Sequence, residues 1–436
     1  VEAASTVTVT ANGTADFLPE SIAAGGGVVA AAGAKSDLST NISTLASIGE
    51  NVQIPNSTEE QSSTRPASLN VSSTFDQDVD ASADSYSIAL ASGAGAGISN
   101  EITTKTDISI GENATISTDN IFLVARNSLE KNRYKDGSNL RSGSAAIGNV
   151  SILLSRTDIG TTSNPFQSEI TIGSGADLTV NGSIASPGTF KVEASSKVEA
   201  IDKVRIETVS GFGVSAGESR IYANTHNTVS LDGATLKNRY GDIYLTSKAD
   251  TENRPSVNMF TASGFAGAGG AAIAETNPVN KIELQNSNVS GKRVNLYAGR
   301  DSFSVDNLLE SSANIEITTV SIAGISVPLP QARISESNTI NVHGNSHLKS
   351  LENLYLVAPT GVGGRATDGD FTRSKASGLC LNLSLIPYGY DVGEEAKRLG
   401  NQTDVSTNTI DISSSAKLEA GVNNVSVVHI KPINNL

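Results

Sequence analysis

The sequence predicts an all-β fold, an elongated parallel β-helix or β-solenoid built from about seven repeats of ~60 residues. The first observation is a short phrase that recurs along the chain with the same spacing of apolar residues, as in DISIGENATI at 107–116. A fixed period is typical of repeat architectures, in which stacked units together bury what one unit alone leaves exposed. The apolar anchors of the successive phrases are Ile48, Ile110, Ile172, Leu231, Leu284, Val342 and Ile412.

The second observation is a strand with alternating apolar residues after each phrase, such as IYLTS at 243–247. Residues i and i+2 of a strand face the same side, so the segment 228–247 divides into two faces. We expect the inward residues to be Val229, Leu231, Leu236, Ile243 and Leu245. We expect the outward residues to be Ser230, Thr235, Lys237, Tyr244 and Thr246. This segment has about the length of one β-helix turn, so a repeat is either three such turns or one wide turn, and the pattern leaves both open.

The third observation is a run rich in glycine and alanine in most repeats, such as GAGAG at 93–97 and GAGGAA at 267–272. Glycine inside a strand weakens it unless a neighbouring backbone approaches closely. These runs therefore predict places where two layers of the fold pack tightly, with alanine as the filler.

The repeat predicts one continuous array over residues 1–436, with the variable parts of the repeats as surface insertions. Three polar segments are expected to be such insertions, 55–68, 127–144 and 387–403. The last contains VGEEAKRL at 392–399, which predicts a short helix. Insertions of this kind often form the binding face of a repeat protein.

Composition narrows the class of protein. The net charge is −14, whereas a nucleic-acid-binding surface needs a basic footprint. No apolar run is long enough for a membrane-spanning helix, and we expect neither a span nor a signal peptide. The single cysteine, Cys380, lies in an apolar run and is expected to be a buried side chain. Together these features favour an extracellular protein that does not rely on disulfides.

Two groups of residues are candidate binding sites. Asp76, Asp78 and Asp80 alternate along one predicted strand face, where carboxylates could hold Ca²⁺, although a solvated acidic surface is the alternative. The second group is a set of basic and aromatic residues in two insertions, whose alternative is a solvated or partly packed loop. It comprises Arg126, Lys131, Arg133, Lys135 and Arg141, which could contact an acidic partner or polysaccharide, and Tyr388 and Tyr390, which could stack on a sugar.

The repeat unit resembles the repeats of large secreted bacterial adhesins, the filamentous-haemagglutinin and leukotoxin-type exoproteins. The resemblance rests on SGFAGAGGAAIA, NTVSL, DGATL and IYLTS, and it covers nearly the whole chain. It implies a long β-helix at the bacterial cell surface. Because a shared fold supports function only weakly, the implied adhesive role stays an expectation.

We therefore expect a non-enzymatic structural or adhesive segment of an extracellular bacterial protein or fibre, with no cofactor. Its partners would be copies of itself, adjoining segments of a longer chain, or cell-surface glycans, and open ends would let copies join into a filament. The alternatives are a β-helical polysaccharide lyase or hydrolase, and a glycan-binding module that uses the insertions. Charged residues gathered in one concave cleft would favour the enzyme.

Overall fold

The computed structural model describes residues 6–54, 67–132, 137–359, 374–387, 401–421 and 428–432, which form 20 strands and no helix. The first third contains β1 Thr6–Phe17, β2 Glu20–Ile48, β3 Gln53–Ile54, β4 Ser68–Val79, β5 Ser82–Ile110, β6 Thr115–Thr118 and β7 Ile121–Lys131. The middle contains β8 Leu140–Ile159, β9 Phe166–Ile172, β10 Asp177–Val180, β11 Phe190–Asp232, β12 Thr235–Gln285 and β13 Asn288–Ala298. The last part contains β14 Leu309–His343, β15 His347–Ser350, β16 Leu354–Ala358, β17 Ser374–Pro387, β18 Asn401–Ile412, β19 Lys417–Ala420 and β20 Val428–Pro432.

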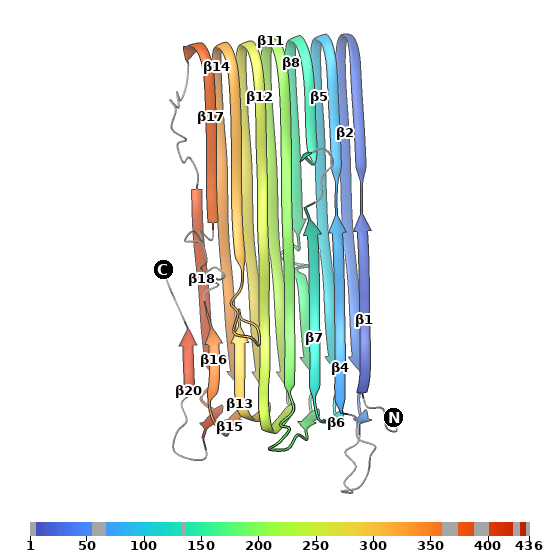
Figure 1. The fold of residues 1–436 in the computed structure, drawn as a ribbon, viewed down its shortest axis with the longest axis vertical. Helices are drawn as coiled ribbons and strands as arrows, with labels where there is room; N and C mark the ends of the chain where they lie inside the picture. The colour runs from blue at the N-terminus through green and yellow to red at the C-terminus, as the bar shows by residue number, and fades with distance from the viewer. Residues whose placement is uncertain are drawn as a thin grey trace.

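One repeat forms one level of the structure, which consists of a rising stretch, a tip, a descending stretch and a short crossing of the base (Figure 1). In the fourth level, β11 rises from Phe190, turns at the tip near Gly211 and descends to Asp232. Each strand pairs in parallel with the equivalent strand of the next level. The rising stretches thus form one face of the molecule and the descending stretches form the other.

The anchors of the repeated phrase stand in one column. Successive anchors are paired partners, from Ile48 with Ile110 through to Val342 with Ile412. The sequence offset between paired levels therefore equals the length of one repeat. Each repeat is one wide turn, and the alternative of three short turns per repeat is wrong.

Alternation of apolar and polar residues explains the interior near the base. All five residues expected to point inward between 228 and 247 are fully buried, and they belong to one apolar cluster that runs through the levels. Thr246 was expected to point outward but is also buried. The segment after β13 folds back over this part of the outer face, since Ser247 bridges to Arg300 and Lys248 Nζ lies 3.4 Å from Asp301 Oδ2.

The glycine and alanine runs lie at the tip, where the two sheets face each other closely. A Cβ atom on Gly217 would lie 3.0 Å from Val257 Cγ1 and 3.1 Å from Ile206 Cδ1. Hydroxyls also link the two sheets, Ser144 with Ser151 at 2.9 Å and Thr319 with Ser326 at 2.8 Å. The expectation of tight packing between two layers is confirmed for Gly217, Gly270 and the buried alanines of these runs, whereas Gly93, Gly95, Gly267 and Gly269 face outward.

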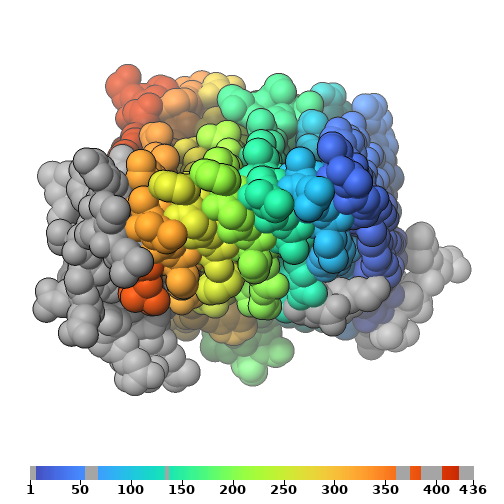
Figure 2. Space-filling model, turned by 90° about the horizontal axis from the view of Figure 1, so that it is seen from above, coloured from blue at the N-terminus to red at the C-terminus, as the bar shows by residue number. Residues whose placement is uncertain are grey.

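The insertions differ from the expected boundaries. Most of 127–144 is strand, because β7 continues to Lys131 and β8 begins at Leu140. Residues 55–66 of the first expected insertion, and 388–400 of the last with the predicted helix, lie outside the described residues. The molecule is elongated along its strands, and the levels stack across that axis in chain order (Figures 1 and 2).

Candidate interaction surface

The three aspartates of the calcium hypothesis share an outer face but do not converge. Asp76 and Asp78 point outward from β4, and Asp80 follows the strand. Successive outward residues of a strand are about 7 Å apart, whereas Ca²⁺ needs its oxygen ligands within about 2.6 Å of the ion. Among the described residues no group of three or more acidic, histidine or cysteine side chains is arranged to hold a metal. The geometry therefore gives the calcium hypothesis no support.

The basic residues do not form one loop surface. Arg126 is exposed on β7 and lies 3.6 Å from Glu193, while Arg141 lies on β8. Lys131, expected at the surface, is fully buried, and its Nζ donates a hydrogen bond of 2.9 Å to Asp202 Oδ1. The expectation is wrong for Lys131 because β7 extends farther than the polar sequence suggested. Arg133, Lys135, Tyr388 and Tyr390 lie outside the described residues.

Cys380 is buried in β17, as expected. Burial raises the pKa of its thiol to about 11, so the thiolate form that a nucleophile requires is scarce at neutral pH. No helix long and apolar enough to cross a membrane occurs among the described residues.

The most distinctive surface lies on the descending sheet near the tip, where the usual polarity of a strand is inverted. In β8, Val150, Ile152 and Leu154 are exposed. The buried residues that alternate with them are Ser151, Leu153 and Ser155, of which two are polar. Close approach of the two sheets explains the small inward residues. It does not explain large apolar residues on the outside, where polar residues are ordinarily found.

Three rows of outward residues, each running across the levels, form what we call the apolar face. The row nearest the tip, row A, contains Val29, Ala91, Gly148, Phe212, Phe265 and Ala323. The middle row, row B, contains Ala31, Gly93, Val150, Val214, Gly267 and Ile325. The lowest row, row C, contains Gly33, Gly95, Ile152, Ala216, Gly269 and Val327. No charged residue belongs to any of the three rows.

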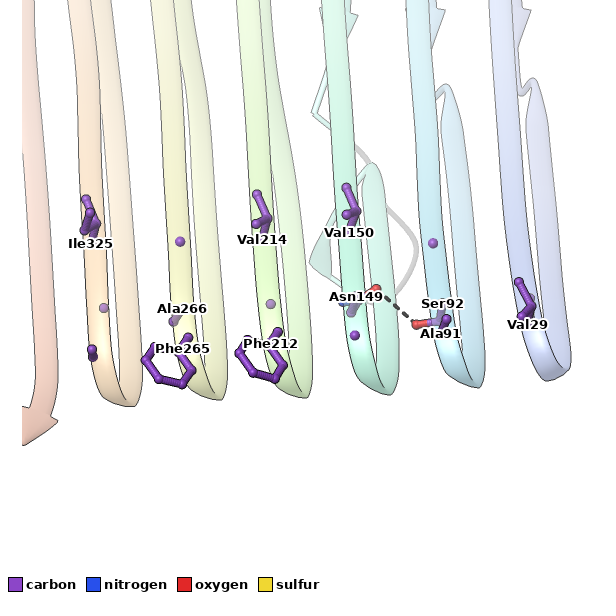
Figure 3. A pocket seen from close by; sticks show the side chains of 17 residues that line it. Val29, Ala91, Ser92, Asn149, Val150, Phe212, Val214, Phe265, Ala266 and Ile325 are labelled. Carbon is purple, nitrogen blue, oxygen red and sulfur yellow. Dashed lines mark hydrogen bonds between the residues drawn. The ribbon is translucent and has the colours of Figure 1, made fainter.

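Rows A and B line a shallow open groove of about 850 Å³ (Figure 3). Phe212 and Phe265 stand side by side at its tip end, with ring centroids 5.2 Å apart and planes 6° from parallel. Val150, Val214 and Ile325 form the next row. Ser92 and Asn149 supply the polar contact of the groove, a hydrogen bond of 3.1 Å between their buried side chains.

The apolar surface extends farther from the tip on the descending sheet than on the rising sheet. On the rising sheet, the outward row nearest the tip, which includes Ile88 and Val209, is apolar, but the next row already contains Glu207. On the descending sheet, charged residues first appear below row C, at Lys35 and Glu218. The apolar surface therefore continues over the tip onto one row of the rising sheet, and it extends farther on the descending sheet.

The rising sheet carries a second, polar groove of about 630 Å³. Its lining includes Arg205, Glu207, Asn258, Phe260 and Glu316. Arg205 Nε donates a hydrogen bond of 2.8 Å to Glu207, and Asn258 Nδ2 donates one of 3.2 Å to Glu316. Both glutamates of this groove thus accept a hydrogen bond from a neighbouring side chain.

Sequence reasoning missed the apolar face, although a signal was present. Charged residues are absent between Asp84 and Glu101 and again between Arg254 and Glu275, in the parts of these levels that surround the tip. Glycine and alanine fill much of these stretches and suggested tight packing alone. The one-wide-turn geometry was needed to show that the charge-free stretches stack on one another.

Comparison with protein-family models, curated proteins and solved structures found no match to this chain.

Proposed function

We propose that the chain is a β-solenoid segment with a non-enzymatic, structural or adhesive role in a bacterial protein that is exposed outside the cell. The observation that carries this proposal is the parallel pairing of each repeat with the next, which builds one stack along the chain and supports a structural role. The resemblance of the repeat unit to secreted adhesins supports the same role.

Many outward charges form links between levels, which suits a scaffold. Lys237 lies 2.8 Å from Asp177 of the preceding level, and Arg254 lies 2.9 Å from Glu310 of the following level. Each such exposed pair contributes at most about 1 kcal/mol, so the pairs help register more than stability. Little charge is left concentrated for chemistry.

The polar groove argues against glycoside hydrolysis. Glu207 and Glu316 lie two levels and two residues apart, which corresponds to about 12 Å between their backbones. Hydrolases place their two carboxyl groups about 5–10 Å apart, a separation that these two glutamates reach only if both side chains lean toward each other. These two glutamates are also held by Arg205 and Asn258.

The first level offers a route to end-to-end assembly. Within the described residues, β1 pairs with β4 and β2 pairs with β5, so that β1 and β2 each use the edge that faces the second level. The opposite edges carry main-chain groups that another strand can pair with, from an adjoining segment of a longer chain or from a second copy.

Two measurements on the producing organism and the purified chain test the proposed role. Immunogold labelling of intact cells is expected to mark their surface, because the role requires exposure. Incubation with a panel of bacterial and host polysaccharides is expected to release no reducing ends and no unsaturated products. Labelling confined to the cell interior, or release of such products, contradicts the proposal.

Glycan binding is a second candidate, favoured by the polar groove with Phe260 at its side. Amide, charged and aromatic side chains in one groove suit the polar and apolar faces of a sugar. A glycan array followed by calorimetric titration tests this role. Phe260→Ala should weaken any binding detected, whereas Phe303→Ala, at an exposed aromatic outside the groove, should not.

A further inference from the structure

We propose that the apolar face is the interface of a two-fold dimer, in which a second copy of this chain packs against it with its strands antiparallel to the first. The axis runs across the levels along row B. Each level then faces the same level of the partner, row B lies on row B, and row A lies on row C. This inference does not depend on the adhesive role.

The first argument is the asymmetry of the surface. A lipid layer around the tip would contact both sheets to the same depth, yet at the depth of row C the rising sheet already carries Glu207, whereas the descending sheet is free of charge. A flat apolar area on one sheet fits a second sheet, as in a β-sandwich. Figure 1 shows the strands of successive levels running nearly parallel, so the face is flat enough for this packing.

The second argument is a match of side-chain size within each level. In five of the six levels one of the two rows has a large residue and the other a small one, and in the second level both Ala91 and Gly95 are small. The pairs include Phe212 with Ala216, Phe265 with Gly269, and Gly148 with Ile152. A two-fold axis along row B places each residue of row A over its row C counterpart on the partner, so that bulky and small residues fit together on both sides.

The third argument is area and charge. Six levels spaced by about 4.8 Å and three rows spaced by about 7 Å give a flat area of roughly 500–600 Å² per copy. Protruding side chains make the buried area larger than this flat estimate, and exposed tip residues such as Leu90 add to it. The buried area thus approaches the ~800 Å² per partner of standard complexes. Lys35 and Glu218 are the first charged residues below row C. In the dimer they lie opposite the tip of the partner, at the rim of the interface, where water still reaches them.

Sedimentation analysis of the full chain between about 1 and 100 µM tests the proposal, because interfaces near the lower size limit associate in this range. The wild-type chain is expected to form a concentration-dependent dimer. Val214→Asp is expected to weaken it at least about tenfold, since two carboxylates would face each other across the axis. Val209→Asp is the matched control: Val209 is 56% exposed and Val214 54%, both lie on β11, but Val209 is on the rising face.

Two further variants test the geometry. Mixing Val214→Asp with Val214→Lys is expected to restore a dimer, because opposite charges would then meet on the axis. Gly269→Val is expected to weaken the dimer by filling the space that Phe265 of the partner subunit occupies, although nothing in its own chain lies within 4 Å of the added Cβ. Ala262→Val, on the rising face of the same level, should leave association unchanged. Circular dichroism checks that each variant is folded.

A wild-type chain that stays monomeric throughout this range overturns the proposal. An equal effect of Val209→Asp, or failure of the mixed charge variants to associate, excludes the two-fold geometry. Flotation with phosphatidylcholine vesicles tests whether lipid covers the apolar face in place of a second copy. Vesicle binding that increases with Gly269→Val would show that the face contacts lipid and would overturn the proposal.

Discussion

Four buried asparagines form a ladder of side-chain amides through successive levels. Asn227 Nδ2 donates to Asn280 Oδ1 at 3.0 Å, Asn280 Nδ2 to Asn338 Oδ1 at 2.9 Å, and Asn338 Nδ2 to Asn408 Oδ1 at 3.2 Å. Each asparagine precedes its anchor phrase by the same offset in the pairing register. A primary amide has both donor and acceptor, so identical residues can satisfy each other from one level to the next.

Asn280→Ala is expected to lower the free energy of unfolding by about 1–3 kcal/mol, because it leaves buried polar atoms on both neighbouring asparagines without this partner. Urea denaturation measures the change. Asn258→Ala, at an exposed asparagine of the same strand β12, is the control and should change stability by less than about 0.5 kcal/mol. Equal effects of the two substitutions would show that the ladder does not stabilise the stack.

A buried ion pair lies inside the stack between the third and fourth levels. Lys131 and Asp202 are both fully buried, and Ser219 Oγ donates a second hydrogen bond, of 3.2 Å, to Asp202 Oδ2. Such a pair adds little net stability, but each charge depends on the other. Loss of one partner is therefore far more costly than loss of both.

Lys131→Met is expected to cost about 3–5 kcal/mol, since it leaves the Asp202 carboxylate buried without its counter-ion. Adding Asp202→Leu to this variant should recover much of the loss. Lys237→Met, which breaks the exposed pair with Asp177, should cost no more than about 1 kcal/mol. Urea denaturation of the single and double variants checks these values, and a double variant as unstable as Lys131→Met would contradict the explanation.

At the scale of elements, the turns that follow the descending strands place either asparagine or glycine in the left-handed region, and in successive levels these residues are Asn51, Asn113, Gly175, Gly233, Asn286 and Gly344. Asn113 and Asn286 have φ of 55° and 52°, and Gly175 and Gly344, one level on, have φ of 72° and 62°. The amide oxygen of each asparagine occupies the space that a Cβ on the next glycine would need. At these two steps, from Asn113 to Gly175 and from Asn286 to Gly344, the asparagine side chain leaves room only for glycine in the next turn.

A double-mutant cycle tests this dependence. Gly344→Ala is expected to cost about 1–3 kcal/mol, because the new Cβ is strained at this φ and overlaps Asn286 Oδ1. In an Asn286→Gly background the same substitution should cost less, since only the conformational strain remains. Additive effects in urea denaturation would show that the two turns do not constrain each other.

Strand alternation was sufficient to predict which residues of 228–247 face inward, because each strand has one side that contacts the interior. It was insufficient for Thr246, which is covered by a returning segment whose path no local pattern specifies. It also missed the apolar face, because outward positions were assumed to be polar. A period of ~60 residues shows which residues of successive repeats are equivalent. It does not show whether each repeat makes one wide turn or three short turns.

At the scale of the whole molecule, the wide turn determines the shape. Ser47 of the first level and Asn341 of the sixth lie in one outward column, linked by pairing through each level between them. Five steps of about 4.8 Å separate their backbones by about 24 Å. Three short turns per repeat would instead require about 72 Å, so a single distance separates the two architectures.

Electron spin resonance between labels at Ser47→Cys and Asn341→Cys is the most direct test of the stacked architecture. The buried Cys380, with its raised pKa of about 11, should label poorly, and dilution with unlabelled chain removes contributions between copies. We expect one distance distribution centred near ~24 Å, broadened by the label arms. A distribution centred near ~70 Å, or none within range, would contradict one wide turn per repeat.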